Sequence, residues 1–76
     1  MDFLLKKGAS SIAIEVKSSR RSSAESLKGL RAIAALKGLE RRLLVYLGPQ
    51  ELQTEDGIEI LPVSRFFEAL QRGALW

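Results

Sequence analysis

Two carboxylates and a lysine near the start of the chain are the residues of this sequence best suited to chemistry. Asp2, Glu15 and Lys17 stand among apolar residues, and the last two are separated by one position. Carboxylate oxygens suit Mg²⁺, which keeps several of its waters, and a nearby lysine could assist a metal-bound water or neutralise charge on a phosphate. These residue types are compatible with a metal site in which Lys17 assists the bound water. Asp2 and Glu15 would hold the metal, with Mg²⁺ as the cofactor.

This chemistry requires a β-hairpin that brings the charged residues together. Two runs with strand character, residues 2–6 and 11–17, flank a short turn that contains Gly8. If Gly8 opens a two-residue loop, antiparallel pairing places Asp2 opposite Glu15. Opposite side chains share a face with Cβ atoms roughly 4.5–5.5 Å apart, and side chains alternate along each strand. We therefore expect the three charged side chains on one face of the hairpin. The other face should carry the apolar residues Phe3, Leu5, Ile12, Ile14 and Val16.

A simpler interpretation stays open, in which these charges are solvated on the polar face of an amphipathic hairpin. Two close carboxylates repel each other unless a cation lies between them. The chain of 76 residues has no cysteine and no histidine, which excludes a disulfide framework, an ordinary zinc site and a Ser-His triad. Any metal must therefore be held by oxygen atoms.

The middle of the chain predicts a crossover helix followed by a buried strand. Ser22 and Glu25 form a capping-box pattern at the start of a helix over residues 23–37, which Gly38 would end. Residues 43–47 form an apolar run that is typical of the interior of a sheet covered on both faces. A strand, a helix and a strand in this order give a right-handed crossover. We expect the strand at 43–47 to be parallel to the strand that carries Glu15.

The end of the chain predicts an edge strand and a last helix within one domain, residues 1–76. Residues 58–61 should form a short antiparallel strand at the sheet edge, stopped by Pro62. Ser64 can cap a final helix, and Gly73 can end it. The apolar face of that helix would carry Phe66, Phe67 and Leu70. The fold class expected is α/β.

The order of these elements resembles the PD-(D/E)xK nuclease superfamily, in which an Asp on one strand and a Glu-x-Lys on the next hold the metal and the attacking water. Residues 2–5, 14–19 and 44–48 are similar to the C-terminal nuclease-like domain carried by a family of prokaryotic AAA+ ATPases. The resemblance covers nearly the whole chain and implies a truncated restriction-endonuclease-like mixed sheet. A helix and a strand come first in that family, so the N-terminal part of the core would be absent here.

This resemblance implies a metal-dependent, nuclease-type phosphodiesterase that acts on DNA or structured nucleic acid, as the C-terminal piece of an AAA+ ATPase. It also implies that Asp2, Glu15 and Lys17 are the catalytic residues. The alternative is a catalytically inactive remnant that binds nucleic acid or dimerises. The net charge of +3, from 12 basic and 9 acidic residues, is compatible with a polyanionic partner but mild. Nucleic-acid contacts are predicted where a phosphate backbone would pass the motif, although such a loop is also typical of a merely solvated surface. The residues concerned are Ser18, Arg20, Arg21 and Lys28.

The first strand also carries a prediction about assembly. With no strand before it, residues 2–6 would form an exposed sheet edge, and such an edge is a template for pairing with another chain. We therefore expect a homodimer in which these strands pair about a two-fold axis. The sequence has no signal peptide and no apolar run near the roughly 20 residues that a membrane span needs. The expected location is the cytoplasm, without a membrane partner.

Overall fold

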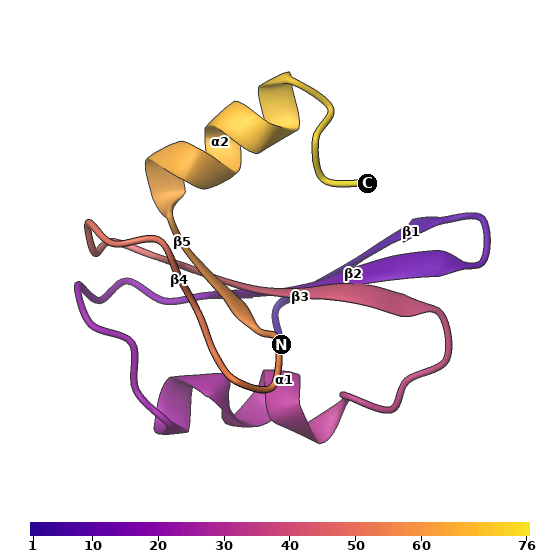
Figure 1. Ribbon diagram of the computed structural model, residues 1–76, viewed down its shortest axis with the longest axis horizontal. Coiled ribbons are helices and arrows are strands. Elements are labelled where there is room, and N and C mark those ends of the chain that lie inside the picture. The colour runs from indigo at the N-terminus through magenta and orange to yellow at the C-terminus, as the bar shows by residue number, and fades with distance from the viewer.

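A mixed sheet of five strands runs through the middle of the molecule, with one helix on each face (Figure 1). The computed structural model describes all residues, 1–76. The strand order across the sheet is β1-β2-β3-β5-β4. The elements are β1 (Phe3–Lys7), β2 (Ser10–Val16), the 3₁₀ turn η1 (Glu25–Leu27), α1 (Lys28–Ala32), β3 (Leu39–Tyr46), β4 (Leu52–Gln53), β5 (Glu59–Pro62) and α2 (Val63–Gln71). The predicted α/β class is therefore confirmed.

The N-terminal hairpin forms with the predicted two-residue loop. Lys7 pairs with Ser10, and the antiparallel register continues outward to Phe3 opposite Ile14. Gly8 has a φ of 62°, a left-handed conformation that glycine adopts at little cost and that such hairpin turns require. The hairpin leaves β1 at one edge of the sheet, as the first strand of the sheet order.

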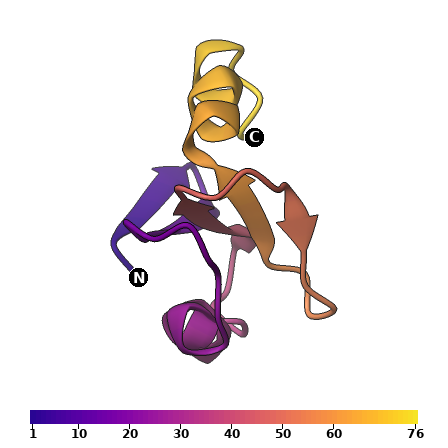
Figure 2. The same ribbon diagram turned by 90° about the vertical axis from the view of Figure 1, so that its left-hand side faces the viewer.

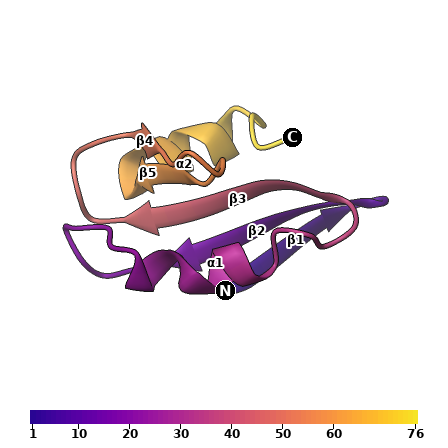
Figure 3. The same ribbon diagram turned by 60° about the horizontal axis from the view of Figure 1, so that its bottom comes forward.

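The parallel pair at the centre of the sheet also forms as predicted. β2 and β3 run side by side, with Ile14 opposite Leu43 and Val16 opposite Val45, and Figure 3 shows their arrowheads at the same end. β3 begins at Leu39, four residues before the predicted start, because the amide of Ser11 donates to the carbonyl of Gly38 at 2.8 Å. This bond extends the pairing back to the turn that precedes β3.

The predicted position of the last strand is wrong. β5 is parallel to β3 and lies inside the sheet, with Leu43 opposite Glu59. The antiparallel edge is instead β4, where Leu52 lies opposite Ile60, and Figure 2 shows it across the sheet from β1. The chain leaves β3, returns through β4, turns near Gly57 and then inserts β5 between them. The edge strand thus lies, in the sequence, between the two predicted strands, at Leu52–Gln53, where no strand was predicted.

The predicted crossover helix is much shorter than expected. A 3₁₀ turn leads into α1, which covers only Lys28–Ala32. Helices depend on tertiary packing of an apolar face, and here only Leu27, Leu30 and Ile33 pack into the core, while the side chains of residues 34–36 are exposed. The capping box that was expected from Ser22 is replaced by Ser23 and Ser26, whose hydroxyls accept from each other's amides at 3.2 and 2.9 Å.

The last helix matches its predicted end but not its predicted start. α2 begins at Val63 without a side-chain cap, so Ser64 lies inside the first turn. Gly73 has a φ of 65° and closes the helix as expected. Phe66 packs against the core, whereas Phe67 and Leu70 remain exposed. Neither this helix nor α1 has the length and apolar character needed to cross a membrane.

Two apolar layers fill the space between the sheet and its helices. The layer under α1 consists of Ala13, Leu27, Leu30, Leu44, Tyr46, Ile58 and Ile60. The layer under α2 consists of Ile12, Ile14, Leu43, Val45, Leu61 and Leu75. Neighbouring residues of β2 and β3 alternate between these layers, as expected for strands buried on both faces. Glu15 lies two residues after Ala13, so its side chain points to the same face of the sheet, toward α1.

Candidate functional site

The two predicted metal ligands lie next to each other at the end of the hairpin, but their carboxylates serve different partners. Asp2 stands one position beyond the pair of Phe3 with Ile14, which places it beside Glu15. Its carboxylate accepts a hydrogen bond from the backbone amide of Val16 at 2.7 Å, and its own amide donates to the carbonyl of Ile14 at 3.0 Å. Asp2 therefore closes the open end of the hairpin.

Glu15 is the buried charge of this site. Its side chain is 12% exposed, and Oε1 lies 2.8 Å from the ammonium group of Met1. The ion pair lies against Gly29 of α1, where an added Cβ would be 3.1 Å from the Met1 nitrogen and 3.4 Å from Oε1. A buried carboxylate needs a close partner to offset the loss of its solvation. The ammonium group fills that need, with the small residue of α1 leaving room for it.

These residues do not fit a divalent ion as they are arranged. Mg²⁺ requires oxygen ligands in near-octahedral geometry, and nowhere in the chain do three acidic side chains gather into a group that could hold a metal. The carboxylate of Asp2 is turned to the amide of Val16. A cation already balances Glu15 at 2.8 Å. The metal-binding roles of Asp2 and Glu15 and the catalytic role of Lys17 stay predictions.

The predicted nucleic-acid contacts follow β2 at the carboxyl end of the parallel strands. The backbone of this loop is fixed to the end of β3, because the amide of Lys17 donates to the Val45 carbonyl and the amide of Leu47 donates to the Ser19 carbonyl, both at 2.9 Å. Ser18, Arg20 and Arg21 extend from this loop, with both arginines exposed. Lys28 lies in α1 and pairs with Glu25 at 3.7 Å.

Three cations of this loop have no acidic partner. Lys17, Arg20 and Arg21 take part in none of the ion pairs of the chain. Most of the other arginines are paired: Arg31 with Asp56, Arg41 with Glu59, Arg42 with Asp56, and Arg65 with Glu51 and Glu68. The free positive charge of the arginines is thus concentrated after β2, with Arg72 as the remaining unpaired arginine.

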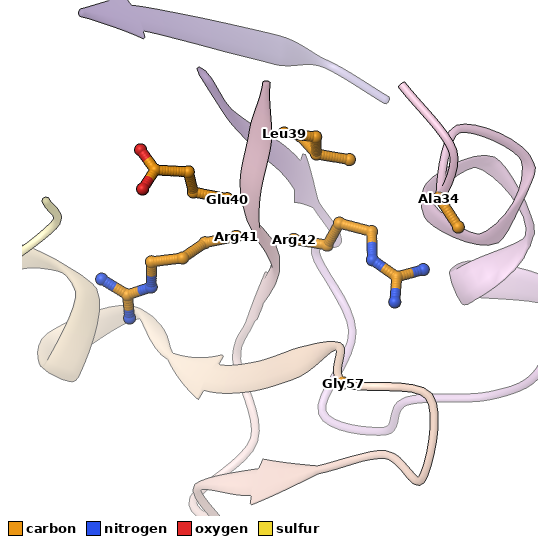
Figure 4. Close-up of a pocket in the computed structure, with 6 residues that line it drawn as sticks. All are labelled: Ala34, Leu39, Glu40, Arg41, Arg42 and Gly57. Carbon is orange, nitrogen blue, oxygen red and sulfur yellow. The ribbon is translucent and has the colours of Figure 1, made fainter. Parts of the chain in front are cut away.

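Arg41 and Arg42 are structural residues that the sequence did not reveal. Figure 4 shows them leaving β3 in opposite directions beside a hollow of about 190 Å³. Arg41 donates to both carboxylate oxygens of Glu59, at 2.8 and 2.6 Å, and to the Leu75 carbonyl at 2.8 Å. The hydrogen bond from Arg41 to Glu59 raises the pKa of Arg41 above its usual value.

Arg42 makes the corresponding contacts on the other face. It donates to the Leu30 carbonyl at 3.3 Å and to the Asp56 carbonyl, and the Asp56 carboxylate lies 3.9 Å away. One strand thus ties α1 and the β4–β5 turn together on one side and β5 and the C-terminal segment on the other. Because both guanidinium groups are satisfied, the hollow that they line offers a ligand no free cation.

Asp56 should make the stability of the β4–β5 turn depend on pH. Hydrogen bonds from the Thr54 hydroxyl, at 2.6 Å, and from Arg31, at 3.1 Å, lower the pKa of Asp56. A lowered pKa in the folded state stabilises the protein above the unfolded-state value, here near 3.8, and this contribution is lost as the pH falls through the folded-state value. Asp56→Asn should therefore destabilise the protein at pH 7 and have a smaller effect near pH 3.

Urea unfolding of the parent and of Asp56→Asn at both pH values measures this difference. Glu55→Gln is the matched control, because Glu55 makes no ion pair and its replacement should change stability little at either pH. The same loss of stability in Asp56→Asn at pH 3 and pH 7 would contradict an ionic role for Asp56.

The fold and this site define a small mixed α/β domain with a buried carboxylate and an unpaired basic loop. Residues 1–66 match the family model described as "Domain of unknown function (DUF4143)". The chain therefore belongs to the DUF4143 family. Neither the curated proteins nor the solved structures gave a match.

Proposed function

We propose that this chain is a catalytically silent, nuclease-like module that binds the sugar–phosphate backbone of a nucleic acid. The observation that carries the proposal is the set of unpaired cations Lys17, Arg20 and Arg21, held at the end of β2 by backbone hydrogen bonds. As the C-terminal part of an AAA+ ATPase, which the sequence resembles, such a module would supply a contact with nucleic acid.

The position of these cations favours a ligand. β2, β3 and β5 are mutually parallel, so their carboxyl termini lie at the same end of the sheet (Figure 3). The carboxyl end of parallel strands is where α/β proteins commonly bind ligands. Arg65, which follows β5 at this end of the sheet, is paired with Glu51 and Glu68 at 3.8 and 3.3 Å. The free charge therefore lies at the β2 end, where an exposed phosphate chain could reach three side chains at once.

The state of the two carboxylates favours binding without cleavage. Metal-dependent hydrolysis would need Asp2 and Glu15 to share an ion. The carboxylate of Asp2 instead accepts from the Val16 amide, and no group of three or more side chains that could hold a metal gathers there. This arrangement supports binding of a polyanion by the basic loop rather than its cleavage.

Fluorescence anisotropy with labelled single-stranded DNA, duplex DNA and RNA tests the proposal. Lys17→Ala/Arg20→Ala/Arg21→Ala should weaken binding about tenfold or more, since each cation that meets a phosphate releases counterions. The slope of log K against log salt should become shallower by about 2–3, at roughly 0.7–0.9 for each phosphate that is no longer neutralised. Circular dichroism would establish that the variant is folded.

The matched control is Lys7→Ala/Lys37→Ala/Arg72→Ala, which removes three other exposed cations that lie outside this loop and take part in no ion pair. It should bind like the parent. An equal loss in the control would indicate attraction to net charge alone and would overturn the proposed site. Mg²⁺-dependent cleavage that Glu15→Gln abolishes would overturn the silent assignment in favour of a nuclease.

A further inference from the structure

An apolar groove opens between the sheet and α2, next to the N-terminal edge. It has a volume of about 240 Å³ and is lined only by apolar side chains: Phe3, Leu5, Ile14, Val16, Phe66 and Leu70. Phe3 is 56% exposed, Val16 47% and Leu70 44%. Contiguous exposed apolar surface of this kind marks an interaction site more often than scattered single residues do.

The groove borders a strand with a free backbone edge. β1 is the first strand of the sheet order and pairs only with β2. In an antiparallel hairpin closed by Lys7 and Ser10, alternate residues direct their backbone groups to the partner strand. By this alternation Leu4 and Lys6 direct their amides and carbonyls away from β2. A second strand could therefore pair here and cover the groove at the same time.

We propose that a second copy of this chain docks at this edge, with the two β1 strands antiparallel and Leu4 opposite Leu4 of the partner subunit. The outward amide and carbonyl of Leu4 then bond reciprocally across the two-fold axis. The amide of Lys6 meets the carbonyl of Asp2 of the partner subunit, and this pairing repeats symmetrically. The inference does not depend on nucleic-acid binding.

The side chains favour this register over its neighbours. Phe3 lies opposite Leu5 of the partner subunit, so the apolar grooves of the two copies join on one face, as cross-strand pairs require. Asp2 lies opposite Lys6 of the partner subunit, which turns an edge lysine that would deter pairing into an ionic partner. Centring the pair on Leu5 instead would set Phe3 against Lys7 of the partner subunit. If one β1 strand shifted by a single residue along the other, its apolar side chains would lie on the opposite face of the joined sheet from those of its partner.

A charge reversal at Lys6 tests both the contact and its register. Sedimentation of the full chain at micromolar concentration should give a dimer. Lys6→Asp, which places two acidic groups opposite each other, should weaken the dimer at least tenfold, whereas Lys6→Arg, which keeps the charge, should not weaken it. The control Arg72→Asp makes the same charge change at an exposed position after α2 and should leave the dimer intact.

The groove itself is tested by two exposed aromatic residues. Phe3→Ser should weaken the dimer, whereas Phe67→Ser, on the outer side of α2 and 57% exposed, should not. A monomer at every concentration would overturn the inference. So would a dimer that Phe67→Ser breaks and Phe3→Ser spares, or a dimer that Lys6→Asp leaves intact.

Discussion

Arg41→Ala should lower the free energy of unfolding by about 2–3 kcal/mol, because it leaves Glu59 and two carbonyls without their donor. The side chains of Arg41 and Glu59 are only 28% and 27% exposed, so solvent can replace the guanidinium group only in part. The carbonyls of Ala74 and Leu75 also lose a bond, at 3.2 and 2.8 Å. Since Leu75 packs in the layer under α2, the C-terminal segment should loosen together with the ion pair.

The loss is large for a domain of this size. Total stabilities of about 0.05–0.15 kcal/mol per residue are usual, and for small domains each kcal/mol shifts the melting temperature by roughly 4–8 °C. The melting temperature of Arg41→Ala should therefore fall by about 10–20 °C by these scalings. Urea unfolding and calorimetry measure the two quantities.

Two further variants separate the ion pair from a general effect of charge. Arg41→Lys should lose most of the same stability, because a lysine cannot bond both oxygens of Glu59 and a carbonyl in one geometry. Arg72→Ala, which removes an exposed arginine without an acidic partner, should stay within about 0.5 kcal/mol of the parent, as surface substitutions usually do. A parent-like stability of Arg41→Ala would contradict this account.

The hairpin could be predicted from the sequence because its rules are local. The turn at Gly8 and the alternation of apolar residues together determine one register, and the structure has Lys7 opposite Ser10 as that register requires. The two-faced burial of β3 followed in the same way from its continuous apolar run. Both predictions use information within a few residues of each other, which is where sequence patterns are most informative.

The direction of β5 could not be predicted in this way. An alternating or apolar run has the same pattern whether the strand runs parallel or antiparallel to its neighbour. The direction here depends on β4, which has two residues and an exposed Leu52, too little for a periodic signal. Arg41 was missed for a related reason, since its partners Glu59 and Leu75 are 18 and 34 positions away.

The sequence predicts where the side chains of the candidate site lie but not which groups their carboxylates contact. The register brought Asp2 beside Glu15, and alternation placed Glu15 on the face opposite to Ile14 and Val16. The choice of partners depended on atoms that carry no sequence signature: the ammonium group of Met1 and the amide of Val16. A backbone group can satisfy a carboxylate as well as a side chain does, so residue types alone do not determine which partner the carboxylate has.

Near the basic loop, the substitution Gly48→Ala should lower the stability of the protein strongly although it adds only one methyl group. Gly48 is buried, and an added Cβ would fall on the ring of Tyr46 and 2.6 Å from the carbonyl oxygen of Arg20. The ring cannot turn aside freely, because the Tyr46 hydroxyl donates to the Gln50 carbonyl at 2.7 Å. Either the Tyr46 bond or the loop must shift, with an expected cost of about 2–3 kcal/mol.

The consequence for function should exceed the consequence for stability. A displaced Arg20 carbonyl moves the loop, so the bond from the Leu47 amide to the Ser19 carbonyl, 2.9 Å long, should open and nucleic-acid affinity should fall. Fluorescence anisotropy with labelled nucleic acid and urea unfolding measure the two effects, and hydrogen exchange at the Leu47 amide reports whether the bond to Ser19 opens. Gly8→Ala is the control: its φ of 62° makes any side chain costly, but no atom lies within 4 Å of the new Cβ, so it should lose only about 1–2 kcal/mol. A Gly48→Ala protein that is as stable as Gly8→Ala and still protects the Leu47 amide from exchange would contradict this account. The position of the basic loop would then not depend on the packing at Gly48.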